Sequence, residues 1–322
     1  MIKIAARFPE VGYYQSKGPV FGKRGDFITA PHISQLFGEI VACWLADKMN
    51  PGKKYVLLEL GPGDGTLLQD IISTIQKLEL WDCIDRIDLH ECSESLKDRQ
   101  RRILQNTGAR FEFVEHLSPL RYQGENVLFL ANEFFDSLPV HCFYRNGIGA
   151  EWSEVLVDYK DRFYFLKSVP DHKLSRLYNL QNLFPRQEDS VEICPEAWRY
   201  SNQIGSIATA CDSFFGLIFD YGIWGPSKWS LRAIKNHKIL SDPLESLGQA
   251  DLTTNVDFQA LAHIFGNYLS CGITTQKRFL LSNGIKDRIS RSSRAKDPSV
   301  IGAANRLLED MGEIFKVLIL KK

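Results

Sequence analysis

Hydrophobic and polar residues follow two different rhythms along this chain. Short, uninterrupted apolar runs, such as residues 55–58 and 127–130, are typical of buried strands, whereas apolar positions repeating every three to four residues predict helices. A clear helical period covers residues 34–49, with Ser34 placed to cap its first turn. Strand and helix patterns then alternate along most of the chain, which predicts an α/β fold.

The apolar pattern predicts seven strands for the main sheet. Five of them belong to strand–helix units, and two more lie near the C-terminus, which indicates a doubly wound sheet. Asp257 is placed to cap a further helix at residues 258–270. The first of these strands is expected to begin at residue 55. The other six are expected at residues 86–91, 109–114, 126–130, 214–222, 273–276 and 315–320.

Two segments interrupt the simple alternation. Residues 151–168 alternate apolar and polar side chains around Lys160 and Asp161, which predicts a β-hairpin, and a polar helical stretch is expected to follow to about residue 203. Residues 223–257 have little regular pattern and are expected to form a long loop on the substrate side. We therefore expect an N-terminal cover, a cofactor-binding core, an inserted lobe and the rest of the core, at residues 1–54, 55–150, 151–203 and 204–322.

Composition and charge exclude several classes of protein. The 322 residues are 44% hydrophobic and 24% charged, and 39 basic residues balance 39 acidic ones, so no overall basic field exists to hold nucleic acid. The seven Cys form no Cys-x-x-Cys pair and the seven His have no metal-ligand spacing. A disulfide framework and a metal site are therefore not expected. The cysteines instead indicate a reducing compartment. No apolar stretch is long enough to span a bilayer.

A glycine-rich turn follows the first core strand. Glu59 precedes Gly61, Gly63 and Gly65, and a helical pattern begins at Thr66. A dinucleotide-binding loop has glycines at its first, third and sixth positions, whereas here they occupy the first, third and fifth. The pattern resembles the nucleotide-binding loop of class I S-adenosylmethionine (SAM) methyltransferases, although an ordinary Gly-rich turn is the alternative.

Glu91 stands at the end of the second strand, where an acid can accept both ribose hydroxyls of an adenosine. This position supports a nucleoside ligand but does not separate SAM from NAD. The alternative is a surface acid without a ligand.

Polar residues gather where the fourth and fifth strands end. Asn132, Glu133 and Asp136 follow the fourth strand and Asp220 ends the fifth. The ligand crevice of an open α/β sheet lies past the carboxyl ends of its strands, and carboxylates buried there need a partner. We expect these residues to belong to a site, with helix capping by Asp136 as the alternative.

Six ordered motifs together resemble the MidA family of SAM-dependent methyltransferases, and this resemblance runs from about Gly12 to the C-terminus. Family members usually carry an additional segment before the GYY sequence, whereas eleven residues precede Gly12 here, so we expect that either the chain starts late or an upstream start codon was missed. The motifs are RGDFITAPHISQLFGE (24–39), LELGPGDGTL (58–67), ANEFFDSLPV (131–140), IFDYG (218–222), QADLTTNVDF (249–258) and MGEIFKVL (311–318).

The resemblance implies a class I methyltransferase fold, with a seven-stranded sheet whose last strand is antiparallel. The pattern at residues 151–203 adds an inserted hairpin and helical subdomain to this fold. The resemblance also implies SAM as cofactor and methyl transfer to a protein arginine, in eukaryotes on a subunit of respiratory complex I. Glu133 and Asp136 are then the catalytic candidates, with Asn132 contacting SAM or the acceptor and Asp220 a weaker candidate. The expected cofactor-binding residues are Glu59, Gly61, Gly63, Gly65 and Glu91, joined on resemblance alone by Arg24, Gly25, Asp26 and Thr29.

Three alternatives stay open on sequence alone. An NAD-dependent oxidoreductase would share the fold and Glu91, although the glycine spacing argues against it. A non-catalytic assembly factor could retain the fold, and a methyltransferase could act on a small molecule, a nucleic acid or another protein. The expected compartment is the cytoplasm in a bacterium or the mitochondrial matrix in a eukaryote, and the sequence does not indicate an oligomeric state.

Overall fold

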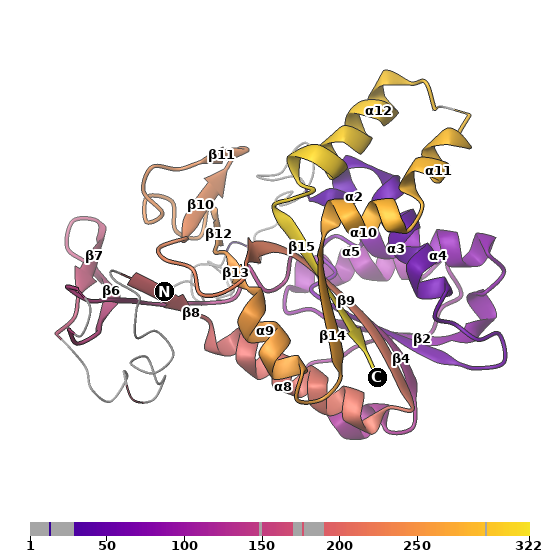
Figure 1. The fold of residues 1–322 in the computed structure, drawn as a ribbon, viewed down its shortest axis with the longest axis horizontal. Helices are drawn as coiled ribbons and strands as arrows, with labels where there is room; N and C mark the ends of the chain where they lie inside the picture. Colours follow the sequence, from indigo (N-terminus) through magenta and orange to yellow (C-terminus); the bar gives the residue numbers. More distant parts are fainter. Residues whose placement is uncertain (1–12, 14–28, 148–149, 170–175, 177–189, 294) are drawn as a thin grey trace.

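A seven-stranded sheet forms the centre of the molecule (Figure 1). The computed structural model describes residues 13, 29–147, 150–169, 176, 190–293 and 295–322. The order along the sheet is β14-β15-β9-β4-β1-β2-β3, and β15 runs antiparallel to both of its neighbours. This order confirms the predicted methyltransferase sheet with an antiparallel last strand. Its strands are β1 (Tyr55–Leu60), β2 (Ile84–His90), β3 (Phe111–Phe113), β4 (Asn126–Asn132), β9 (Ser213–Ile223), β14 (Ser270–Thr275) and β15 (Phe315–Lys321).

Helices cover both faces of this sheet. Each strand contributes apolar side chains to both faces. Leu57 of β1 joins one apolar cluster, whereas Val56 and Leu58 join the other, because successive side chains point to opposite faces. One face carries α3 (Gln35–Ala46), α4 (Thr66–Lys77), α10 (Gln276–Ser282) and α11 (Ile285–Ser290). The other carries α8 (Pro195–Ala210) and α9 (Phe258–Phe265). The remaining helical segments are α2 (Ala30–Ile33), α5 (Glu94–Leu104), α12 (Pro298–Asn305), η2 (Trp81–Cys83), η3 (Pro119–Tyr122) and η4 (Arg306–Asp310).

Both predicted helix caps are confirmed. The Ser34 hydroxyl accepts a hydrogen bond from the backbone amide of Leu36 (3.2 Å), and Asp257 accepts one from Ala260 (3.0 Å). Helix α9 ends at Phe265, earlier than expected, because β14 already begins at Ser270.

The inserted lobe contains a second, antiparallel sheet with the order β7-β6-β5-β8. The predicted hairpin is confirmed by β6 and β7, which pair from Val155 opposite Lys167 to Tyr159 opposite Phe163. The helical stretch expected before α8 is wrong at Ser190–Ile193, which form strand β8, and most of the remainder lies outside the described residues. The four strands are β5 (His141–Tyr144), β6 (Ser153–Tyr159), β7 (Phe163–Lys167) and β8 (Ser190–Ile193).

The expectation of a long loop at residues 223–257 is wrong. Three short strands, β10 (Arg232–Lys235), β11 (Lys238–Ile239) and β12 (Asp251–Thr253), form a small sheet here, and β13 (Val256–Asp257) pairs with β9. Strands of two to four residues are too short for the apolar period to reveal. The turn between β10 and β11 has positive φ angles at Asn236 (51°) and His237 (61°), as two-residue hairpin turns require.

No helix in the described part of the chain is long and apolar enough to cross a membrane.

Candidate active site

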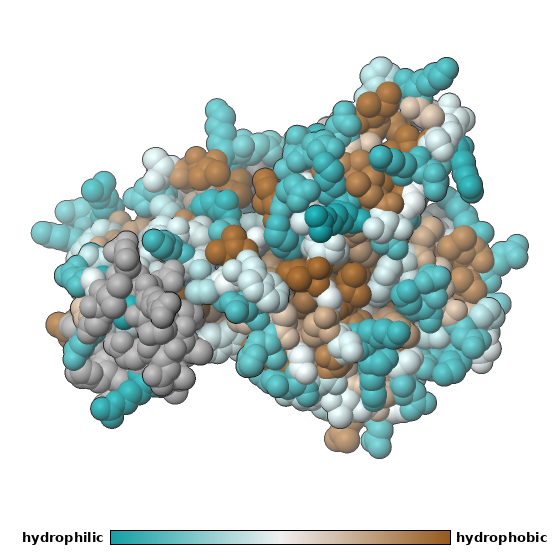
Figure 2. All heavy atoms as spheres, in the orientation of Figure 1, coloured by the Kyte–Doolittle hydropathy of each residue, from teal (hydrophilic) through white to brown (hydrophobic). Residues whose placement is uncertain are grey.

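A cavity of about 390 Å³ lies where β1, β2, β4 and β9 end. Its lining comes from the glycine-rich turn after β1, the loops after β2 and β4, helix α2 and the small β10–β12 sheet. Met311, Ile314 and Phe315 add an apolar side to the lining. Figure 2 shows hydrophobic residues gathered near the centre of the view, where Figure 1 draws β13 and β15. The volume suits one small organic molecule of nucleoside size or larger.

The glycine-rich turn needs its glycines for backbone conformation and for space. Gly61 and Gly63 line the cavity with φ angles of 60° and 58°, which side-chain-bearing residues rarely adopt. A Cβ on Gly61 would lie 2.8 Å from the Phe134 ring. Gly65 (φ 86°) is not among the lining residues; it caps α4, and a Cβ there would lie 2.7 Å from Ile103. Two of the three glycines therefore face the cavity and the third shapes the turn.

Glu59 and Glu91 place two carboxylates on the same cavity. Glu59 Oε2 is buried and has no hydrogen-bond partner in the described chain, and burial, then Glu91, raises the Glu59 pKa to about 8. Glu91 Oε1 accepts from the backbone amides of Cys92 (2.8 Å) and Ser93 (2.9 Å), which fixes the carboxylate at the end of β2. Gln100 holds the two regions together by donating to the Gly63 carbonyl (2.6 Å).

The loop after β4 brings the predicted acid pair to the other side of this cavity, beside Asn132. Glu133 has a φ angle of 51°, a strained conformation for a residue with a side chain, and its amide donates to the Phe219 carbonyl (2.8 Å). Within the described residues, Glu133 Oε1 and Asp136 Oδ1 are buried without hydrogen-bond partners. Burial, then the neighbouring Asp136, raises the Glu133 pKa to about 8, and burial also raises the pKa of Asp136.

Asp220 does not line the cavity. Its Oδ2 accepts from the amides of Phe135 (3.0 Å) and Asp136 (3.2 Å), and its Oδ1 accepts from that of Tyr221 (2.9 Å). The carboxylate therefore holds the backbone of the loop that carries Glu133 and Asp136, and it does not face the cavity.

Sequence reasoning missed several lining residues from β9, β10 and β12. Thr253 donates to Asp136 Oδ2 (2.7 Å), and the Arg232 guanidinium lies 5.0 Å from the centre of the Tyr221 ring. Arg232 also donates to Asn255 Oδ1 (2.9 Å). Asp251 and Thr253 both line the cavity and belong to the family motif at residues 249–258. The motif could have pointed to them, but nothing in its sequence assigned either residue to the site.

His90 and Tyr200 form a second missed pair. His90 Nδ1 donates to the Val114 carbonyl (2.7 Å), and in a neutral ring the other nitrogen then accepts from the Tyr200 hydroxyl (3.0 Å). Tyr200 also meets Phe134 edge to face, with ring centres 4.9 Å apart, which joins α8 to the cavity wall.

The N-terminal candidates divide in two. Thr29 lines the cavity, whereas Arg24, Gly25 and Asp26 lie outside the described residues. In the part of the chain that is described, no group of three or more His, Cys, Asp or Glu residues could hold a metal ion.

Comparisons with known proteins agree on one family. A family model described as an S-adenosyl-L-methionine-dependent methyltransferase matches residues 36–275. The zebrafish (Danio rerio) protein arginine methyltransferase NDUFAF7, mitochondrial, is 35% identical over 96% of this chain and 79% of its own length. The Caenorhabditis elegans homologue of that enzyme is 33% identical over 98% of this chain and 80% of its own.

A solved structure has the same fold over the whole chain. The crystal structure of a COG1565 superfamily member from Burkholderia thailandensis, bound to S-adenosyl-homocysteine, superposes with a TM-score of 0.84. It covers 100% of this chain and 86% of the other, at 24% identity.

The residues on this cavity fit SAM. Gly61 and Gly63 leave backbone open to a ligand, Glu91 is fixed where a ribose acid is needed, and the unpartnered Glu59 oxygen offers an acceptor for a cationic group. The chain therefore belongs to the MidA family of S-adenosyl-L-methionine-dependent methyltransferases.

Proposed function

We propose that this protein methylates an arginine side chain of another protein, and that the acceptor is a subunit of respiratory complex I or its bacterial counterpart. The relatives that are 35% and 33% identical carry the name protein arginine methyltransferase, which supports the arginine as acceptor. The complex I subunit rests on the family resemblance. The compartment follows the host, as cytoplasm or mitochondrial matrix.

The acid pair is the observation that carries this proposal. Glu133 and Asp136 both line the cavity that the glycine turn also lines, and each has a buried carboxylate oxygen that is unpartnered within the described chain. A guanidinium is planar and always charged, and it matches two carboxylate oxygens through paired N–H donors. An arginine side chain would therefore supply the donors that these oxygens lack.

The chemistry divides between cofactor and protein. SAM supplies an activated methyl group on its sulfonium. Glu133 and Asp136 hold the acceptor guanidinium in line with that methyl group, because alignment supplies much of the rate of such a displacement. The guanidinium loses one proton as its N–CH₃ bond forms, and Glu133 Oε1, on a carboxyl whose pKa is about 8, can accept it.

Labelled methyl transfer tests the proposal. The purified protein is incubated with SAM labelled in its methyl group and with an extract of the host lacking this gene. Labelled proteins are then hydrolysed and their amino acids separated. We expect base-stable label in methylarginine, reduced about 10²-fold or more by Glu133→Gln, since an aligned charged contact is worth this much in a transition state.

Calorimetry with SAM serves as the control, because Glu133→Gln should still bind the cofactor. Label that appears as methyl esters, as methyllysine or in small molecules would overturn the arginine proposal but leave the methyltransferase intact. A complete absence of transfer despite SAM binding would support the non-catalytic alternative.

A further inference from the structure

His32 connects helix α2 to the glycine-rich turn. Its Nε2 lies 2.9 Å from Asp64 Oδ2, and its Nδ1 lies 2.7 Å from the Thr29 hydroxyl oxygen. Because a carboxylate only accepts, Nε2 carries the proton towards Asp64, and the Nδ1 of a neutral ring accepts from Thr29. The His32 and Asp64 side chains are 14% and 21% exposed, so solvent screens this contact only partly.

Asp64 fixes the turn from within. It lies between Gly63 (φ 58°) and Gly65 (φ 86°), and its Oδ1 accepts from both the amide (3.1 Å) and the hydroxyl (2.8 Å) of Thr66. Glycines lose much conformational freedom when a turn is held in one form. The contact with His32 adds an anchor 32 residues away in the sequence.

Helix α2 also reaches the acid pair. The backbone amide of Ala30, its first residue, lies close enough to the Glu133 carboxyl to oppose the rise in its pKa. The same short helix therefore contacts both the turn that binds the cofactor and the loop that carries Glu133. Thr29, His32, Asp64 and Thr66 all line the cavity.

We propose that His32 is a positioning residue: it locks α2 against Asp64, so that the glycine-rich turn is held ready for the cofactor while Ala30 is held against Glu133. The contact acts through Asp64 and not by touching the reacting atoms. This role is independent of which molecule accepts the methyl group.

The charge on Asp64 is consistent with this lock. Burial raises the Asp64 pKa, but hydrogen bonds from His32 and Thr66 outweigh it and hold the pKa below its ordinary value. The carboxylate therefore stays ionised near neutral pH and remains a strong acceptor.

Calorimetric titration with S-adenosylhomocysteine tests the lock without any acceptor. We expect His32→Ala to weaken binding about tenfold, and His32→Gln, whose amide can still donate to Asp64, to recover much of the loss. His141→Ala is the matched control: His141 also pairs with a carboxylate (Glu154, 2.6 Å), but it lies in the inserted sheet and does not line the cavity. Measured well below the unfolding temperature, the affinity does not respond to a general loss of stability, so the control should bind as wild type.

A double-mutant cycle with Asp64→Ala separates positioning from direct contact. If His32 acts through Asp64, the double variant binds no more weakly than Asp64→Ala alone. Wild-type affinity in His32→Ala, or effects of the two substitutions that simply add, would overturn the proposal. If His32→Ala does not fold, His32→Leu takes its place, because leucine fills the space but cannot donate to Asp64, and the same criterion applies.

Discussion

Asp220 is a fully buried carboxylate that accepts hydrogen bonds from three backbone amides, two of them in the loop after β4. An amide buried without an acceptor costs about 1–3 kcal/mol. Its chemical role is therefore to hold Phe135 and Asp136 in place, so that the acid pair keeps its position on the cavity.

Asp220→Ala should lower the free energy of unfolding by roughly 2–4 kcal/mol, since the three amides lose their acceptor together. Asp220→Asn keeps one acceptor oxygen and should lose less than the alanine variant. Urea denaturation of both variants measures the difference. Equal stability of Asp220→Ala and wild type would show that the loop is held by other contacts.

For individual residues, the sequence was a good guide to which side chains lie at the cavity. It was a poorer guide to what each of them does there. Asn132, Glu133 and Asp136 could be placed because strand ends converge at one edge of a parallel sheet. The role of Asp220 could not, because it depends on amides about 85 residues away that become neighbours only on folding. His32 was missed for the same reason, since its partner Asp64 belongs to another element.

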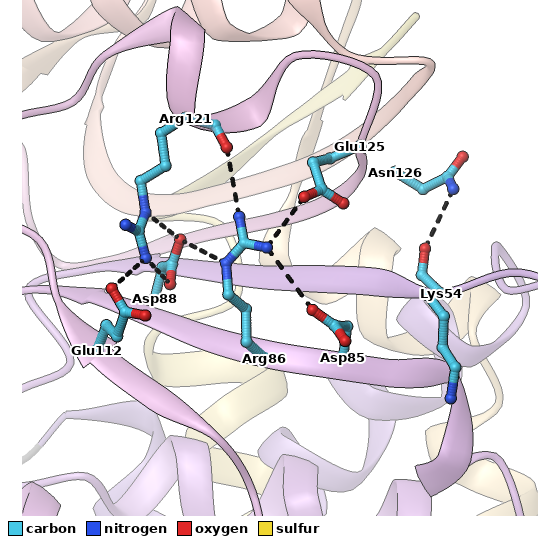
Figure 3. A network of polar contacts seen from close by, with 8 residues as sticks. All are labelled: Lys54, Asp85, Arg86, Asp88, Glu112, Arg121, Glu125 and Asn126. Carbon is cyan, nitrogen blue, oxygen red and sulfur yellow. Dashed lines mark hydrogen bonds and ion pairs between the residues drawn. The ribbon is translucent and has the colours of Figure 1, made fainter.

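Elements at one edge of the main sheet are joined by an ion-pair network (Figure 3). Arg121 of η3 holds Asp88 of β2 through two contacts of 2.8 Å and also donates to Glu112 of β3 (2.7 Å). Arg86 joins Asp88 to Glu125 with contacts of 3.4 and 3.0 Å. Strand β3 has only three residues, and the contact between Arg121 and Glu112 adds a side-chain link to its backbone pairing with β2.

Asp88→Asn should cost about 3 kcal/mol in unfolding free energy, because two arginines lose the fully buried carboxylate that they share. Asp47→Asn is the matched comparison. Asp47 also pairs with a basic residue, Lys48 (2.7 Å), but is 74% exposed, and exposed pairs contribute little to stability. Similar losses in chemical denaturation of the two variants would contradict the importance of burial.

The inserted sheet is joined to the small β10–β12 sheet through Glu192 of β8. Glu192 Oε1 accepts from the amides of Ser230 (2.7 Å) and Leu231 (3.1 Å). The Ser230 hydroxyl oxygen in turn accepts from the amide of Asn255 (2.9 Å), and Asn255 holds Arg232 on the cavity. The short strands that periodicity did not reveal therefore connect the insertion to the acid side of the site.

Glu192→Ala should disturb this side of the cavity more than the cofactor side. We expect stability to fall by roughly 2–3 kcal/mol, since buried amides lose their acceptor, while affinity for S-adenosylhomocysteine changes less than threefold. Urea denaturation and calorimetry measure the two effects separately. A cofactor affinity that falls tenfold or more would contradict the division of the site into two sides.

Over the whole molecule, basic and acidic residues are equal in number, but several of the acids are buried. The main fold could be predicted because strand and helix periods are local, and the sheet order followed from the family motifs. The burial of acids could not, because it depends on how distant loops close over the cavity. Burial is the largest cause of a raised pKa for Glu59 and Glu133, both about 8, and for Asp70, about 7.

These shifts predict how stability depends on pH. A carboxyl whose pKa is about 4 in the unfolded chain and about 8 in the folded one binds a proton more tightly when folded. Between these two values the folded state holds more protons than the unfolded state, so the free energy of unfolding falls as pH rises. We therefore expect the cofactor-free protein to be less stable at pH 8.5 than at pH 6, by on the order of 1–2 kcal/mol for each such group after relaxation.

Glu133→Gln tests this sign at one residue, because glutamine keeps an acceptor for the Ala30 amide but cannot ionise. At pH 5 the wild-type carboxyl is protonated in the folded state, and the variant should have nearly wild-type stability. At pH 8.5 the wild type must hold a buried charge, so the variant should be the more stable protein although we expect it to transfer methyl groups about 10²-fold more slowly. Urea denaturation at both pH values measures this crossover, and a variant that is less stable than wild type at pH 8.5 would contradict it. The expected gain would mean that the unpartnered carboxylate costs stability in the free protein, and that the cost persists because the site needs the charge when the acceptor is bound.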